Sequence, residues 1–167
     1  MVEPQSIAGR VALSPVNPGR DWNRVVGWTT AALGVGTGLV MGLWSFDGPL
    51  PVPAWIGEYG ETSRRLVRLG HIALIGLGIL DILLARELPR SALRASAKRL
   101  AAWAMILGNV FLPLTLFAAA AFRPLKYFMA LPASCVFVAL LLAAHGARRP
   151  VDAAGRERDG SGLPPAV

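Results

Sequence analysis

Two polar side chains lie inside long apolar segments. Because a polar group in such a segment costs free energy, these two residues are candidates for a structural or functional role. Asp81 lies in the run Ile-Leu-Asp-Ile-Leu-Leu, and Asn109 lies in a second apolar segment, residues 100–122. An ionised carboxylate inside a membrane span costs about 3 kcal/mol when central, so Asp81 must pair with a donor or carry a proton. Asn109 is a candidate donor, and the side chain of Arg86, five residues further on, is another group that could reach Asp81. A hydrogen bond that fixes the register of two helices and a group that handles a proton or a ligand both fit this pair.

A second group of polar side chains has helical spacing. Arg64, Arg68 and His71 follow the pattern i, i+4, i+7, so they share one face of a helix. Two guanidiniums and an imidazole near the end of a span are suited to an anionic lipid headgroup, a phosphate or a haem propionate. The alternative is that the arginines extend to the interface while His71 bonds to a neighbouring helix.

Glycines are spaced for close helix packing in the first apolar segment. Gly34, Gly38 and Gly42 form two overlapping GxxxG units, and Gly78 adds a small residue on the His71 face of the second segment. Small residues let another helix approach closely and gain packing contacts that lipid does not supply. The pattern therefore predicts helix packing through this stripe. Either a partner protein or the second segment of the same chain occupies it.

The sequence contains no motif for a disulfide, a metal site or a known catalytic site. The single cysteine, Cys135, cannot form an intrachain disulfide and belongs to no metal-binding motif. His71 and His145 are expected at opposite faces of a bilayer about 30 Å thick, so they cannot ligate one haem together. HExxH, Walker, Rossmann and GxSxG patterns are missing. We therefore assign no catalytic residue, no metal site and no cofactor from the sequence.

The elements that must position these groups are four apolar segments. The chain has 167 residues, 54% hydrophobic and only 16% charged, whereas soluble domains carry about 25% charged residues. Each segment is close to the roughly 20 residues that span a bilayer. We predict a four-span membrane domain over residues 25–146, with helices at approximately 25–46, 66–85, 100–122 and 127–145.

The regions outside the spans are polar and rich in glycine and proline. We expect residues 1–24 to form a flexible cytoplasmic tail and residues 147–167 to form a disordered one. The first span is too long for the core of a signal peptide, so we expect it to be retained. Trp22 and Trp44 flank it, as expected for an aromatic belt at the headgroup level.

The basic residues predict an orientation and argue against nucleic-acid binding. Twelve of the 17 Lys and Arg residues fall on the side that holds both termini and the loop between the second and third spans. The positive-inside rule places that side in the cytoplasm. The net charge is +7, but the basic residues lie on either side of the spans and form no separate basic module. We therefore expect no nucleic-acid partner. Frequent Ala, Gly and Arg suggest a bacterial plasma (inner) membrane.

The sequence thus predicts an all-α protein, an integral membrane four-helix bundle with both termini on the cytoplasmic side. Its partners are the lipid bilayer and either another membrane protein or further copies of itself. We rank a non-enzymatic membrane subunit or accessory protein first, on composition and glycine spacing. The alternatives are a small proton-linked transporter that uses Asp81 and Asn109, and a haem- or quinone-binding redox subunit near His71.

Overall fold

The computed structural model describes residues 18–45, 48–58 and 61–148, and its described part is all helical apart from turns and loops. Four α-helices follow one another, with a short 3₁₀ helix before the last. The predicted all-α, four-helix fold is confirmed. In chain order the elements are α1 (Pro18–Gly42), α2 (Thr62–Glu87), α3 (Ala95–Ala121), η1 (Arg123–Met129) and α4 (Ala130–Ala147).

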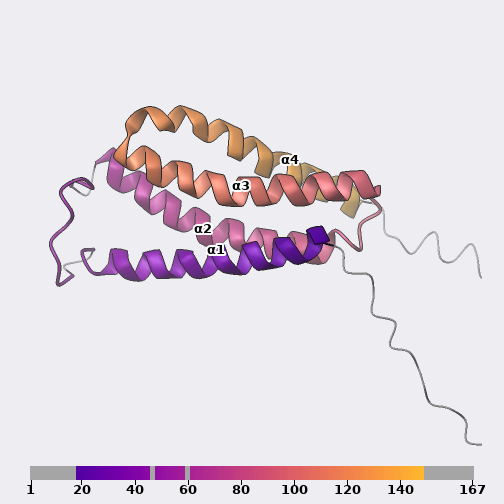
Figure 1. The fold of residues 1–167 in the computed structure, drawn as a ribbon, viewed down its shortest axis with the longest axis horizontal. Coiled ribbons are helices and arrows are strands. Elements are labelled where there is room, and N and C mark those ends of the chain that lie inside the picture. Colours follow the sequence, from indigo (N-terminus) through magenta and orange to yellow (C-terminus); the bar gives the residue numbers. More distant parts are fainter. Residues whose placement is uncertain (1–17, 46–47, 59–60, 149–167) are drawn as a thin grey trace, which may run out of the picture.

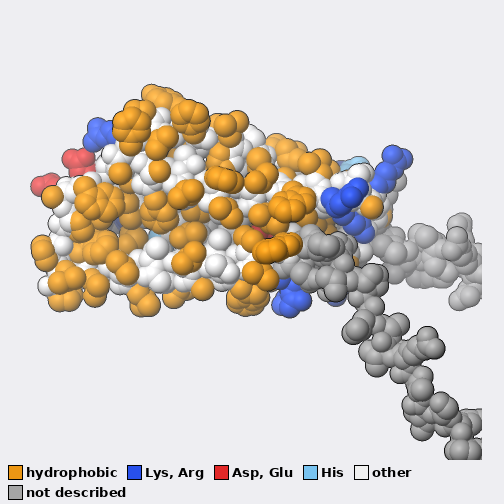
Figure 2. All heavy atoms as spheres, in the orientation of Figure 1, with side chains coloured by type: hydrophobic (Ala, Val, Ile, Leu, Met, Phe, Trp, Pro, Cys, Tyr) orange, Lys and Arg blue, Asp and Glu red, His pale blue; other side chains and the backbone are white. Residues whose placement is uncertain are grey.

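All four helical segments are long and apolar enough to cross a membrane, as a membrane protein requires. The candidate spans are Trp22–Gly42, Thr62–Glu87, Ala95–Ala121 and Arg123–Ala147. In Figure 2, hydrophobic side chains cover the middle of the visible face, and charged side chains gather toward the two ends of the long axis. An apolar belt with polar ends is the surface that a bilayer stabilises.

The helices run up and down with consecutive helices side by side (Figure 1). α1 packs against α2, α2 against α3, and α3 against α4. α2 and α3 lie between the other two, and their apolar windows are accordingly more buried than those of α1 and α4. The start of α1 and the end of α4 lie at the same end of the bundle, as an even number of antiparallel helices requires.

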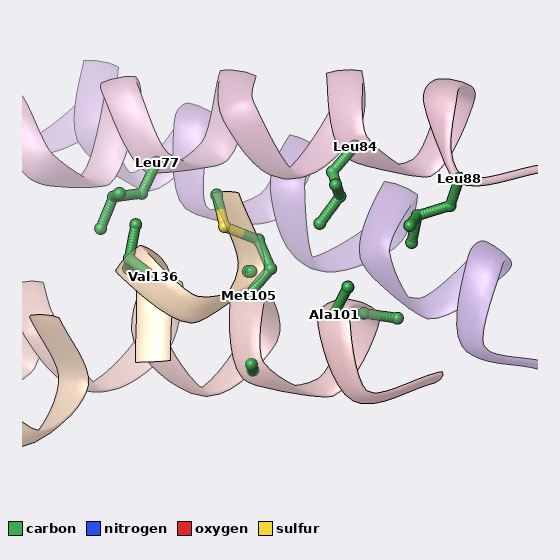
Figure 3. Close-up of a cluster of buried hydrophobic side chains, with 9 residues drawn as sticks. Leu77, Leu84, Leu88, Ala101, Met105 and Val136 are labelled. Carbon is green, nitrogen blue, oxygen red and sulfur yellow. The ribbon is translucent and has the colours of Figure 1, made fainter. Parts of the chain in front are cut away.

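The core between α2, α3 and α4 combines leucines on one side with small residues on the other (Figure 3). Leu77 and Leu84 of α2, together with Leu88 directly after it, meet Ala101 and Met105 of α3. Val136 and Ala139 of α4 complete the cluster. Alanines at the centre let the backbones approach closely, which gains dispersion contacts in a solvent that offers no hydrophobic driving force.

The helix boundaries differ from those expected at both ends of α1. The helix begins at Pro18 and not at Val25, so residues 18–24 of the expected tail are helical. The helix ends at Gly42, four residues before the expected end. Pro18 fits a first helical turn because its missing N–H would have no partner there. Residues 1–17 and 149–167 lie outside the described residues.

α1 leaves an open apolar groove on its side of the bundle. α1 and α2 diverge toward the loop that joins them (Figure 1). The groove, with a volume of about 870 Å³, is lined by aromatic residues that include Trp28, Trp44, Trp55 and Phe117. Ile56 of the joining loop lines it as well and is only 1% exposed. The loop therefore packs back against the helices it connects.

Candidate functional site

Asp81 forms a polar centre that joins three helices. Its side chain is fully buried, with 0% exposure. The Asn109 side-chain amide on α3 donates to Asp81 Oδ2 at 3.0 Å, as the sequence predicted. The Asn23 side-chain amide on α1 donates to Asp81 Oδ1. Asn23 also donates to the backbone carbonyl of Ala102 at 3.1 Å, so this one side chain links α1 to both α2 and α3.

The close crossing of α1 and α2 brings Asn23 to Asp81. A Cβ on Gly78 would lie 2.7 Å from the carbonyl oxygen of Gly27 and 2.9 Å from the backbone nitrogen of Ala31. Only glycine fits such an approach of two backbones. Asn23 is one turn before Gly27, and Asp81 is about one turn after Gly78. The glycine contact therefore sets the distance at which the two polar side chains meet.

The two asparagines each keep one buried polar atom without a partner. Both residues are 0% exposed, and neither Asn23 Oδ1 nor Asn109 Oδ1 has a hydrogen-bond partner within the described part of the chain. A buried acceptor left without a donor costs about 1–3 kcal/mol. An ionised Asp81 has no proton to give these oxygens. A protonated Asp81 has one, so rotation of a carboxyl or an amide group would allow it to reach one of them.

Sequence reasoning missed Asn23 because it assigned residues 1–24 to the tail. The polar residues Asp21, Asn23 and Arg24 lower the hydropathy there. A local pattern points to the earlier start, because Asn17 precedes Pro18. Asn at the N-cap position followed by Pro at the first helical position is a frequent helix start. With the helix begun at Pro18, Asn23 becomes a polar residue inside the first span.

His71 belongs to a different part of the molecule. It precedes Asp81 by ten residues on α2, which is about 15 Å along the helix axis. Its Nδ1 lies 2.8 Å from the Gly34 carbonyl oxygen and 3.3 Å from the Thr37 hydroxyl, both on α1. The bond to a carbonyl places the proton of a neutral ring on Nδ1. The expected hydrogen bond from His71 to a neighbouring helix is therefore present.

The three glycines of the stripe, Gly34, Gly38 and Gly42, have three different surroundings. A Cβ on Gly34 would lie 2.5 Å from Ile75 Cγ1 and 3.0 Å from the Ile75 nitrogen, so α2 covers this position. A Cβ on Gly38 would lie 2.6 Å from Cε1 of His71, so this glycine accommodates the imidazole. Gly42 faces open space. Along most of its length, the stripe is therefore filled by the second helix of the same chain.

Arg64, Arg68 and His71 line one pocket of about 270 Å³ near the loop that joins α1 and α2. Asp81 and Asn109 do not line it. The sequence-predicted residues thus fall into two separate places, a polar centre around Asp81 and a pocket around His71. Within the described residues, no group of three or more His, Cys, Asp or Glu side chains is placed to hold a metal ion.

Comparison with known proteins adds no family to this description. No family model, no curated protein and no solved structure matches the chain. The contacts of the polar groups inside the four helices are therefore the basis on which a function can be assigned.

Proposed function

We propose that the chain is a multi-pass membrane protein in which Asp81 takes up and releases a proton, as the central group of a small proton-linked carrier. Both termini of this protein lie on the cytoplasmic side of the membrane, in keeping with the distribution of Lys and Arg residues. One observation carries the proposal. The carboxylate is fully buried and bonded to two neutral amides, and the oxygens of those amides have no partner among the residues that the structure describes.

The arrangement accommodates both states of a proton-binding carboxyl group. The ionised form accepts the two amide N–H bonds, which offset part of its desolvation. The neutral form needs an acceptor for its own proton, and Asn23 Oδ1 and Asn109 Oδ1 are both within the same cluster. Two hydrogen-bonded states at one buried site are what repeated loading and release require.

A purely structural role is the competing explanation. Interhelical hydrogen bonds in membrane proteins contribute about 0.6 kcal/mol on average, and Asp81 would then act only as a link between α1, α2 and α3. A link of this kind needs no change of protonation. Asn in place of Asp81 would serve it equally well, because an amide also bonds to Asn23 and Asn109. The two explanations therefore differ in what Asp81→Asn does.

The test is infrared difference spectroscopy of the purified protein, titrated from about pH 4 to about pH 10. We expect a band from the C=O stretch of a buried carboxylic acid that appears on acidification and is missing from Asp81→Asn. Glu87→Gln is the matched control, since this carboxyl group is exposed on the same helix. Identical titrations of wild type and Asp81→Asn, with both proteins folded, would show that Asp81 binds no proton.

The carrier part of the proposal has its own measurement. Protein reconstituted in liposomes that contain a pH-sensitive dye is exposed to a potassium diffusion potential. We expect proton uptake with wild type, and uptake as slow as in protein-free liposomes with Asp81→Asn. A proton-dependent infrared band without any such uptake would restrict Asp81 to proton binding and remove the transport step.

The other two hypotheses stay predictions. An accessory subunit that docks through its glycines has less surface than the spacing implied, because α2 covers Gly34 and α1 covers Gly78. Its test is a stoichiometric partner after gentle purification. A redox subunit near His71 predicts an absorption band from haem or an extractable quinone. Neither outcome bears on the protonation of Asp81.

A further inference from the structure

The polar centre around Asp81 holds enough oxygen atoms to surround a small cation. Five oxygens belong to it: the two carboxylate oxygens of Asp81, the side-chain oxygens of Asn23 and Asn109, and the backbone carbonyl oxygen of Ala102. Oxygens of these three kinds are the ligands that hard cations take, whereas transition metals favour His and Cys side chains. Residues of α1, α2 and α3 would together hold such an ion.

Two of these oxygens are buried without a use in the structure. Asn23 Oδ1 and Asn109 Oδ1 bond to no described residue, and both side chains are 0% exposed. A buried oxygen without a partner is unfavourable, and an interhelical link to Asp81 needs only the amide nitrogens. A cation inside the cluster would bind both oxygens, so it explains why amides occupy these two positions.

Rotation of each amide about its Cβ–Cγ bond would turn the oxygens toward the carboxylate. The amide nitrogens now occupy those positions, since Asn109 Nδ2 lies 3.0 Å from Asp81 Oδ2 and Asn23 Nδ2 lies 3.1 Å from the Ala102 carbonyl oxygen. Oxygens that bind one cation at about 2.4 Å and at a right angle to each other are about 3.4 Å apart. The rotated cluster therefore surrounds a small cation after shifts of roughly a few tenths of an ångström.

The charge of the cluster selects a monovalent ion. Its three side chains carry a single negative charge, on ionised Asp81, and the hydrogen bonds to that carboxylate come from two neutral amides. A monovalent cation makes the cluster neutral, whereas a divalent one would leave a net positive charge inside the span, which is costly. The short distances between the polar atoms favour Na⁺ over the larger K⁺.

We propose that the polar centre binds one Na⁺ ion through Asp81, the side-chain oxygens of Asn23 and Asn109, and the Ala102 carbonyl. Asp81 lies six residues before the end of α2 at Glu87, or about 9 Å along the helix axis, so the ion has a short way to that end of the bundle. Na⁺ and a proton would use the same carboxylate, so that binding of one Na⁺ releases one proton. This exchange rests on the proposed function, whereas the binding of Na⁺ does not.

The experiment measures equilibrium binding of radiolabelled Na⁺ to the purified full-length protein in detergent, at about pH 9, where a carboxyl group is more readily ionised. We expect saturable binding of one Na⁺ per chain. Unlabelled Na⁺ should displace the label at a concentration at least about tenfold lower than K⁺ or Ca²⁺ requires. Absence of saturable binding, or equal displacement by the three ions, would overturn the proposal, and neither result depends on a variant.

Variants decide whether the ion binds at the polar centre. Asp81→Asn removes the charge and should weaken Na⁺ binding about a hundredfold or more, and Asn109→Ala removes one ligand and should weaken it about tenfold. Glu87→Gln is the control for charge, because this carboxyl group is exposed on the same helix. Ser134→Ala is the control for a lost polar group, because its exposed hydroxyl bonds only to its own helix. Equal affinities of Asp81→Asn and Glu87→Gln, with both proteins folded, would overturn the site.

Binding of Na⁺ and binding of a proton can be told apart. An infrared band that is missing from Asp81→Asn, without saturable Na⁺ binding, would keep the proton site and overturn the Na⁺ site. Saturable Na⁺ binding that Asp81→Asn abolishes, without such a band, would support the Na⁺ site and overturn the proton site.

Discussion

The Asn23 side-chain amide donates a hydrogen bond to the Asp81 carboxylate, although the two residues are 58 positions apart in the chain. Asn109 donates to the second carboxylate oxygen, so a single side chain of α2 links α1 and α3. The contact places three polar residues where all the surrounding segments are apolar. Hydrogen bonds are the cheapest way to keep such groups inside a membrane span.

Asn23→Ala should destabilise the protein because it removes donors to both Asp81 and the Ala102 carbonyl. We expect a loss of about 1 kcal/mol in the free energy of unfolding, in the range of interhelical hydrogen bonds in membranes. Unfolding by sodium dodecyl sulfate in mixed micelles measures it. Ser134→Ala is the control, since its exposed hydroxyl bonds only to the Ala130 carbonyl of its own helix. Equal stability of the two variants would mean that the Asn23 contacts contribute nothing.

A double-mutant cycle should show that Asp81 and Asn109 act as a pair. Asn109→Ala removes a donor from a buried carboxylate, but in an Asp81→Ala background that carboxylate is already gone. The second substitution should therefore cost less there than in wild type. The interaction energy should be about 0.5–3 kcal/mol, as found for residues in direct contact. Additive effects, measured by the same unfolding assay, would contradict the observed bond.

Gly78→Ala should weaken the packing of α1 on α2. Its methyl group would lie 2.7 Å from the Gly27 carbonyl oxygen, and two backbones cannot give way as a flexible side chain can. We expect a loss of about 1–3 kcal/mol, as for overpacked cores. Gly76→Ala, on the same helix and facing open space, should be neutral or gain about 0.5–1 kcal/mol from reduced chain entropy. The reverse order of stability would refute the close crossing.

The orientation in the membrane can be tested by thiol labelling. In a Cys135→Ala background, single cysteines are introduced as Thr62→Cys at the start of α2 and Ser96→Cys at the start of α3. Both positions are exposed and lie at opposite ends of the bundle. A membrane-impermeant maleimide added to intact cells should label the cysteine at 62 and not the one at 96. The opposite pattern would invert the proposed topology.

The sequence by itself determined the class of fold and the number of helices. Long apolar runs such as residues 100–122 allow only one structure in a bilayer, because every backbone N–H and C=O must find its partner within the helix. It also indicated Asn109 as a candidate partner of Asp81, since a polar group in such a run must pair with the few others at its depth. Local composition is sufficient for inferences of this kind.

Only the tertiary structure decided which residues complete the polar centre and what the glycines do. Asn23 joins Asp81 because α1 crosses α2 closely at Gly27 and Gly78, and a crossing point depends on the packing of whole helices. Gly34, Gly38 and Gly42 have the same spacing in the sequence, yet their surroundings differ. Gly34 packs against α2, Gly38 lies against the His71 ring, and Gly42 faces open space. A helix that diverges from its neighbour gives equivalent positions different surroundings, and the divergence is set by contacts far along the chain.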